Sequence, residues 1–158
     1  MAILRALKWI LGSIAAVVVI LGVALYLLFG VFLGPSEDEV ARVTSPAGDI
    51  DAVLIETNGG ATTSFGYEVF VVGHGRLPKK KPVAYLYGAI RSENAYGLNM
   101  RWPEPDLLVI EYMRAKNAVL EKDVVSVGGK LIRVTMRSGV VNLAAPSGGM
   151  LFNLKGRQ

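Results

Sequence analysis

The sequence predicts a mainly β protein, in which a single N-terminal transmembrane helix precedes an antiparallel, meander- or sandwich-like β domain. The helix follows from residues 10–33, a run without any charged side chain. The β domain follows from a period-two alternation of apolar and polar residues after Thr44, which is typical of strands with one buried and one wet face. The segments between these strands are rich in Gly, Pro, Asn and Ser, as turns require.

The apolar run is long enough to cross a membrane. As a helix it would measure about 36 Å, whereas the hydrocarbon core of a bilayer is about 30 Å thick. The run is also longer than the apolar region of a cleaved signal peptide, which holds roughly 7–15 residues and ends in a small-x-small cleavage site. It ends instead in bulky residues followed by Gly34 and Pro35. We therefore predict an uncleaved, single-pass signal anchor.

The residues that flank the run predict its orientation. Arg5 and Lys8 precede it, Trp9 stands at its edge, and an acidic segment, residues 37–39, follows it. Basic flanks tend to stay in the cytoplasm, and an interfacial Trp anchors at headgroup depth. The expected order is a cytoplasmic N-terminus (1–9), a transmembrane helix (10–33), a linker (34–43) and an extracytoplasmic β domain (44–158).

Eight strands are predicted in the domain, and two of their connections are specific. Residues 103–106 are too rich in proline for a strand and are expected to form a hairpin turn, which would bring Arg101 near Glu111. Gly128 and Gly129 are typical of a two-residue hairpin turn. Residues 113–122 are expected to form a short helix or an irregular crossover. The predicted strands are 50–57, 65–72, 83–90, 96–102, 107–113, 124–127, 131–137 and 140–143.

Composition excludes several kinds of site. The chain has no cysteine, so disulfides, thiolate metal sites and a cysteine nucleophile are excluded. His74 is the only histidine and has no second His or Cys with which to hold a metal, so we expect it in a surface loop. All 13 acidic residues and all but two of the 17 basic ones follow the apolar run, a mixed surface unlike that of a nucleic-acid-binding protein. We expect no cofactor, no metal and no nucleic-acid partner.

The loop at residues 59–64 is the strongest candidate for a binding site. Gly59 and Gly60 permit a positive φ, and consecutive N–H groups in such turns can hold an anion. Thr62, Thr63 and Ser64 add hydroxyl groups, so the loop suits a phosphate, a carboxylate or a glycan hydroxyl. The alternative is a structural hairpin loop whose hydroxyls satisfy their own backbone, which is the more common arrangement.

A second candidate is the basic segment 79–81, which places three lysines between two prolines. Such a segment can contact anionic lipid headgroups, although a solvated loop is the more common role. No catalytic residue is assigned from the sequence.

Two parts of the chain resemble known families. Residues 58–65, N-G-G-A-T-T-S-F, are similar to the G-G-A-T-T-S-F segment of small membrane-anchored bacterial domains of unknown function, which often have an S-P-x-G strand upstream. Residues 45–49, S-P-A-G-D, and 102–106, W-P-E-P-D, more weakly resemble the strand openings of β-propeller blades. The chain is too short for the four or so blades that close a propeller. The first resemblance implies a bacterial, membrane-anchored protein and no known activity.

These observations predict a single-pass protein of the bacterial inner membrane whose β domain is a non-enzymatic binding or interaction module of the envelope. Its expected partners are the lipid bilayer and an envelope protein or cell-wall component. Two alternatives remain. One is an envelope hydrolase or transferase with Thr62, Thr63 or Ser64 as nucleophile. The other is an assembly subunit whose helix oligomerises through Gly12 and Ala16. The oligomeric state is not predicted.

Overall fold

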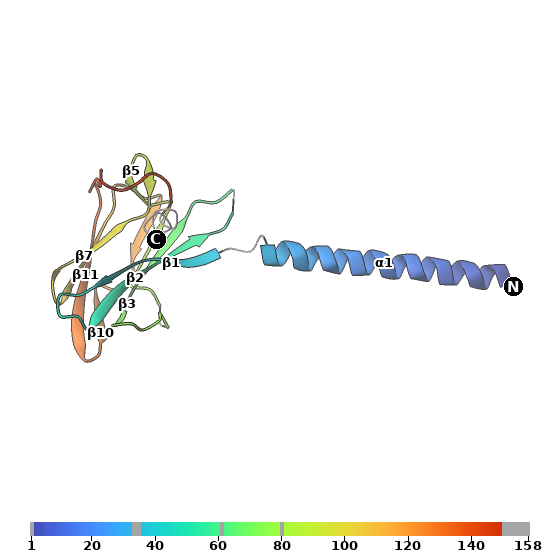
Figure 1. Cartoon of the computed structure of the whole chain (residues 1–158), viewed down its shortest axis with the longest axis horizontal. Coiled ribbons are helices and arrows are strands. Elements are labelled where there is room, and N and C mark those ends of the chain that lie inside the picture. The colour runs from blue at the N-terminus through green and yellow to red at the C-terminus, as the bar shows by residue number, and fades with distance from the viewer. Residues whose placement is uncertain (1, 33–35, 61, 80, 150–158) are drawn as a thin grey trace. The chain divides into compact units, whose positions relative to one another are not determined.

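The computed structural model describes residues 2–32, 36–60, 62–79 and 81–149 (Figure 1). Its backbone forms two compact units, Met1–Gly34 and Pro35–Gln158. The first contains the helix α1 (Ala2–Phe32), and the second consists of strands in two main sheets and one small hairpin. The predicted fold class, mainly β with one N-terminal apolar helix, is confirmed.

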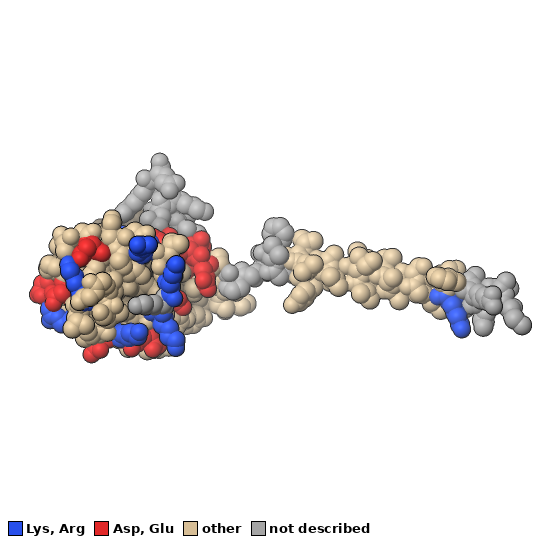
Figure 2. Space-filling model, turned by 90° about the horizontal axis from the view of Figure 1, so that it is seen from below, with Lys and Arg blue, Asp and Glu red and all other residues tan. Residues whose placement is uncertain are grey.

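Helix α1 is long and apolar enough to span a membrane. Its segment Lys8–Leu28 has a mean hydropathy of 2.7, and every side chain in that segment is exposed. Lys8 is the one charged side chain on the described surface of the helix (Figure 2). The helix begins at Ala2 rather than at residue 10, because the Ala, Leu, Arg and Lys residues before Trp9 are also good helix formers.

The predicted linker contains a strand. Residues Ser36–Thr44 form β1, which pairs antiparallel with β2 (Ile50–Asn58). β1 is an edge strand in which only the side chain of Val40 is buried, so its sequence lacks the apolar alternation of an inner strand. A bulge between Glu39 and Ala41 further disturbs the alternation. The β fold therefore begins eight residues earlier than Thr44.

The first sheet has five strands in the order β1-β2-β3-β4-β9. All of its neighbours are antiparallel. The segment 113–122, expected as a helix or crossover, contributes β9 at the edge of this sheet. Three of its apolar residues, Ala118, Val119 and Leu120, are consecutive rather than alternating, and its pairing with β4 is a tertiary contact that local sequence does not reveal. The bounds of the three further strands are Gly66–Gly73 (β3), Ala84–Tyr87 (β4) and Asn117–Leu120 (β9).

The second sheet has four strands in the order β10-β11-β8-β7. Here β8 and β11 are parallel, the one exception among the strand pairs that the structure describes. A separate hairpin consists of β5 (Ile90–Ser92) and β6 (Ala95–Tyr96). The bounds of the four strands are Asn99–Glu104 (β7), Leu107–Glu111 (β8), Val124–Val127 (β10) and Lys130–Arg137 (β11).

Several local predictions can be compared with this topology. Gly128 and Gly129 form the two-residue turn between β10 and β11, both with positive φ. Arg101 Nε donates to Glu111 Oε1 at 2.8 Å, as expected. Other predictions are wrong in detail. The predicted strand 83–90 is interrupted at Gly88, where φ is +60°. Residues 103 and 104 belong to β7, where a register shift accommodates the proline, and 140–143 do not form a strand.

The core lies between the two main sheets. Leu54, Val69 and Leu86 from the first sheet are fully buried, as are Leu108, Ile110 and Ile132 from the second. Each set occupies alternate positions of its strands, so each sheet buries one face against the other. The β5–β6 hairpin, Ser64 and residues 114–116 line the candidate site described below.

Candidate functional site

The glycine-rich loop holds its own shape with local hydrogen bonds. Gly60 N donates to Asn58 Oδ1 at 2.9 Å, and the backbone N and the Oγ1 of Thr63 both donate to the Gly60 carbonyl at 3.1 Å. Gly60 has a φ of +96°, a conformation that suits glycine. Thr62 is exposed. Of the five residues predicted to bind a ligand, Ser64 lines the pocket described below, whereas Gly59, Gly60, Thr62 and Thr63 do not.

Ser64 is held between two side chains from other elements. Its backbone N donates to the hydroxyl of Tyr87 at 2.9 Å, and its Oγ accepts from Lys116 Nζ at 2.7 Å. The ammonium of Lys116 also lies 5.8 Å from the centre of the Tyr87 ring, a cation–π contact that stabilises its positive charge. Ser64 and Lys116 are 52 residues apart in the chain, so the fold alone brings them together.

Gly88 makes room for this arrangement. It lies between β4 and β5 with a φ of +60°, and its N donates to the Phe65 carbonyl at 2.8 Å. A Cβ at this position would lie 3.0 Å from the Cγ and Cδ of Lys116 and 3.4 Å from the Cβ of Ser64. Any larger residue would therefore displace the lysine side chain and strain the backbone at once.

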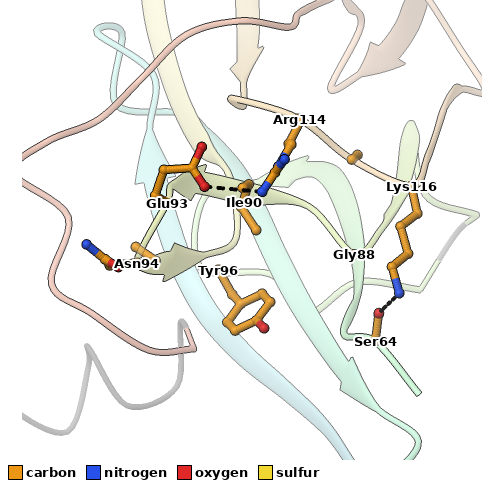
Figure 3. Close-up of a pocket in the computed structure, with 10 residues that line it drawn as sticks. Ser64, Gly88, Ile90, Glu93, Asn94, Tyr96, Arg114 and Lys116 are labelled. Carbon is orange, nitrogen blue, oxygen red and sulfur yellow. Dashed lines mark hydrogen bonds and ion pairs between the residues drawn. The ribbon is translucent and has the colours of Figure 1, made fainter. Parts of the chain in front are cut away.

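An ion pair also lies in this pocket. Arg114 Nη2 donates to Glu93 Oε2 at 3.2 Å, and both side chains are well exposed to solvent. In Figure 3, Arg114 points toward Glu93 and Lys116 points toward Ser64, so the two cations serve different parts of the pocket. The pocket has a volume of about 560 Å³, which is within the usual range for small-molecule sites.

Tyr96 supplies an aromatic surface to the pocket. Its side chain is 45 % exposed, and its ring meets the ring of Phe65 edge to face at a centroid distance of 5.4 Å. Arg91, which is buried, donates from Nε to the Tyr96 carbonyl at 3.0 Å and fixes the backbone of this strand. Asn94, in the turn between β5 and β6, adds an exposed amide to the lining.

The pocket has more positive than negative side chains in its lining. Two cations, Arg114 and Lys116, and one acid, Glu93, line it, and Ser64 and Asn94 can donate hydrogen bonds. Lys116 has no carboxylate partner among the residues that the structure describes. A phosphate or carboxylate can therefore bind Lys116 without first displacing an acidic side chain.

His74 lies in a surface loop after β3, as predicted, but its side chain has a partner. Nδ1 of His74 donates to Asp51 Oδ1 at 3.0 Å, while Asp51 Oδ2 accepts from Arg42 Nη1 at 2.8 Å and from the Gly75 amide at 2.9 Å. The Asp51 side chain is fully buried. Burial alone would raise its pKa, yet the hydrogen bonds from His74, Gly75 and Arg42 outweigh burial and hold the pKa well below its usual range. These residues do not line the pocket that contains Ser64.

The residues predicted to anchor the chain lie on α1. Trp9 is 79 % exposed, and its carbonyl accepts a hydrogen bond from Ser13 Oγ at 2.8 Å. Lys8 is exposed, while the side chain of Arg5 is outside the part of the molecule that the structure describes. No cluster of three or more His, Cys, Asp or Glu side chains suited to a metal is found among the described residues.

Of the loop predicted as a binding site, Ser64 lies in this pocket, and the other residues of the pocket were not predicted. Glu93, Asn94, Tyr96, Arg114 and Lys116 were not predicted as site residues. Arg114 and Lys116 did carry a signal, because two cations spaced by two residues fall on one side of an extended segment. That signal was hidden by the expectation of a helix or crossover at 113–122. The pocket's other contributors are brought in by β5 and β6, and most of this hairpin falls between the predicted strands 83–90 and 96–102.

Comparison with known proteins adds no relative. No family model, no curated protein and no solved structure matches the chain.

Proposed function

We propose that this chain is a single-pass binding module of the bacterial envelope, anchored in the inner membrane by α1 with its N-terminus in the cytoplasm and its β domain outside. The length and hydropathy of α1 support the anchor. Arg5 and Lys8 before the apolar run, and acids only after it, support the orientation. The segment 58–65 and its likeness to small anchored bacterial domains support the envelope assignment.

The function assigned to the β domain is recognition of a small anionic ligand in the pocket of Ser64 and Lys116. The observation that carries it is the Lys116 ammonium, which Ser64 and Tyr87 position and which has no ion-pair partner among the described residues. Arg114 adds a second, planar donor group that suits a carboxylate or phosphate.

Tyr96 and Asn94 suggest the chemistry of the uncharged part of this ligand. An exposed aromatic ring beside hydrogen-bonding groups suits a sugar ring, which presents an apolar face and a rim of hydroxyls. A volume of about 560 Å³ has room for such a ring. The proposed ligand class is therefore a sugar that carries a phosphate or carboxylate, as cell-wall components do.

The alternative function is a hydrolase or transferase with Ser64 as nucleophile. The 2.7 Å contact between Ser64 Oγ and Lys116 Nζ favours it, because serine–lysine pairs are one way to activate a hydroxyl. However, Lys116 donates to the hydroxyl and is exposed beside an aromatic ring that stabilises its charge. A lysine acts as a base only when it is desolvated enough to be neutral. The binding function is therefore preferred.

Calorimetry on the full chain in neutral detergent micelles tests this proposal. The probes are inorganic phosphate, a hexose phosphate, a hexuronic acid and an uncharged hexose. We expect the two anionic sugars to bind at least about tenfold more tightly than the uncharged hexose. Lys116→Met, which keeps an aliphatic stem but removes the charge, should weaken anion binding by about tenfold or more, since hydrogen bonds to charged groups contribute about 1.5–3 kcal/mol.

Lys130→Met is the matched control. Lys130 is another exposed lysine, paired with Asp49 and outside the pocket, so its loss should leave ligand affinity unchanged. Equal affinity for charged and uncharged hexoses, or an unchanged affinity in Lys116→Met, would contradict the proposal. Covalent labelling by a fluorophosphonate that is lost in Ser64→Ala would instead establish the enzymatic alternative.

A further inference from the structure

A second concave surface lies away from the anion pocket. It is formed by the end of β3, residues 77–83 and the β10 strand, with a volume of about 190 Å³. Its floor is apolar and includes Phe70, Val83 and Val125. This volume equals about six water molecules, which is enough for a side chain or a short piece of acyl chain but not for a whole lipid.

Three lysines surround this groove. Lys79 and Lys81 come from the proline-flanked loop, and Lys122 comes from the connection between β9 and β10. The amides of Glu121 and Lys122 both donate to the Val83 carbonyl, at 2.9 and 3.1 Å, which holds Lys122 beside that loop. The three lysines therefore form a cluster from two distant segments rather than a local run.

The cluster is not neutralised by its surroundings. No acidic side chain lines the groove, and none of the three lysines has an ion-pair partner within the described residues. Glu121 and Asp123 flank Lys122 in sequence but do not line the groove. Most other charges of the domain are paired, as Arg101 is with Glu111.

An apolar side chain projects next to the cluster. Leu77 is 70 % exposed, and it lies in the groove's lining between Arg76 and the lysines. The base of its loop is fixed, because the Gly75 amide donates to buried Asp51 and the Arg76 carbonyl accepts from Arg42. An exposed leucine on a fixed loop, surrounded by unpaired lysines, is an arrangement suited to the boundary between acyl chains and headgroups.

We propose that the face formed by Leu77, Lys79, Lys81 and Lys122 docks on anionic phospholipids of the membrane that holds α1. Charge complementarity with lipid phosphates identifies the occupant. The proposed anchor also keeps the domain near a bilayer, because only three residues separate α1 from β1 in the sequence. Leu77 then inserts among the acyl chains while the lysines contact the phosphates. This docking is separate from ligand recognition in the anion pocket.

A fluorescence measurement on the full chain in nanodiscs tests the docking. Because the chain has no cysteine, Leu77→Cys gives a single site for the fluorophore NBD. Leu143→Cys is the matched control, since Leu143 is the more exposed leucine, at 88 %, and does not line the groove. The nanodiscs contain phosphatidylcholine with or without phosphatidylglycerol, each with a spin-labelled lipid as quencher.

We expect quenching at position 77 to be at least twofold stronger with phosphatidylglycerol than without it, and quenching at position 143 to be the same in both. A triple variant should lower the fraction of docked molecules about tenfold or more, when Lys79, Lys81 and Lys122 are all changed to Gln. The reason is that each lysine contributes about 1 kcal/mol at an anionic surface. Changing Arg101, Arg133 and Arg137 to Gln removes equal charge elsewhere and should have little effect.

Three results would overturn the docking. If quenching at position 77 equals quenching at position 143, the proposed face does not contact the membrane. Equal quenching of position 77 in neutral and anionic discs would exclude recognition of the lipid charge. An equal loss of quenching in the arginine and lysine variants would assign the effect to net charge rather than to this face. None of these results depends on whether sugars bind the anion pocket.

Discussion

The helix α1 and the β domain use the same apolar residues in opposite ways. Leu21 in α1 is 56 % exposed, whereas Leu54 in β2 is 0 % exposed. The backbone hydrogen bonds of a helix form within the helix, so α1 needs no strand-like pairing with the rest of the chain, and its exposed apolar surface is suited to a bilayer. Each strand of the domain instead needs a neighbour that is often far away in sequence. The comparison separates a helix whose apolar side chains are exposed from a domain whose apolar side chains pack against one another.

The largest expected effect comes from the same substitution in both regions. Leu54→Ala should lower the free energy of unfolding of the β domain by about 3 kcal/mol, because it removes a fully buried side chain and leaves a cavity. Leu21→Ala should change it by less than about 0.5 kcal/mol. Urea unfolding in micelles, followed by Trp102 fluorescence in a Trp9→Phe background, measures both. A similar loss in the two variants would show that the domain depends on α1 for its packing.

The buried carboxylate of Asp51 provides the next largest effect, and it depends on pH. Asp51→Asn should cost about 2–3 kcal/mol, because an amide cannot accept the hydrogen bonds from Arg42, His74 and Gly75 together. Its pKa is lower in the folded domain than in the unfolded chain, where it is near 3.8. The stability that it provides is therefore complete above that value and is lost as pH falls through the folded pKa.

The difference in stability between the wild type and Asp51→Asn should accordingly stay constant from about pH 7 to pH 5 and shrink below about pH 4. Urea unfolding at a series of pH values checks this. A difference that already shrinks between pH 7 and pH 5 would contradict the assignment of this pH dependence to the Asp51 carboxylate.

The smallest expected effect is that of an exposed ion pair. Arg101 and Glu111 are in contact at 2.8 Å, but the arginine side chain is 44 % exposed. A double-mutant cycle with Arg101→Ala and Glu111→Gln should give a coupling energy of about 0.5 kcal/mol, which 1 M salt reduces. A coupling above about 2 kcal/mol would mean that this surface is shielded from solvent by a partner.

The sequence predicts features that depend on local residues better than features that depend on distant strand partners. The helix was predicted because its signal is composition alone, and the hairpin at Gly128 was predicted because its signal is local. β1 and β9 were missed because both are edge strands with few buried side chains and exist through pairing with β2 and β4. The pocket was missed for a related reason, since Ser64 and Lys116 meet only after β3, β4 and β9 have been placed beside one another.

The parallel pairing of β8 with β11 has a consequence for how the chain folds. β11 is the last strand of the second sheet, and the segment 112–129 that precedes it must first place β9 in one sheet and β10 in the other. As the chain is synthesised from its N-terminus, the inner edge of β8 stays without a partner until residue 137 has emerged. Contacts between such distant segments form slowly, and an unpaired apolar edge is prone to aggregate. Pairing of β11 with β8 is therefore the folding step that a chaperone would assist. A truncation that removes β11 would leave this edge of β8 open to aggregation.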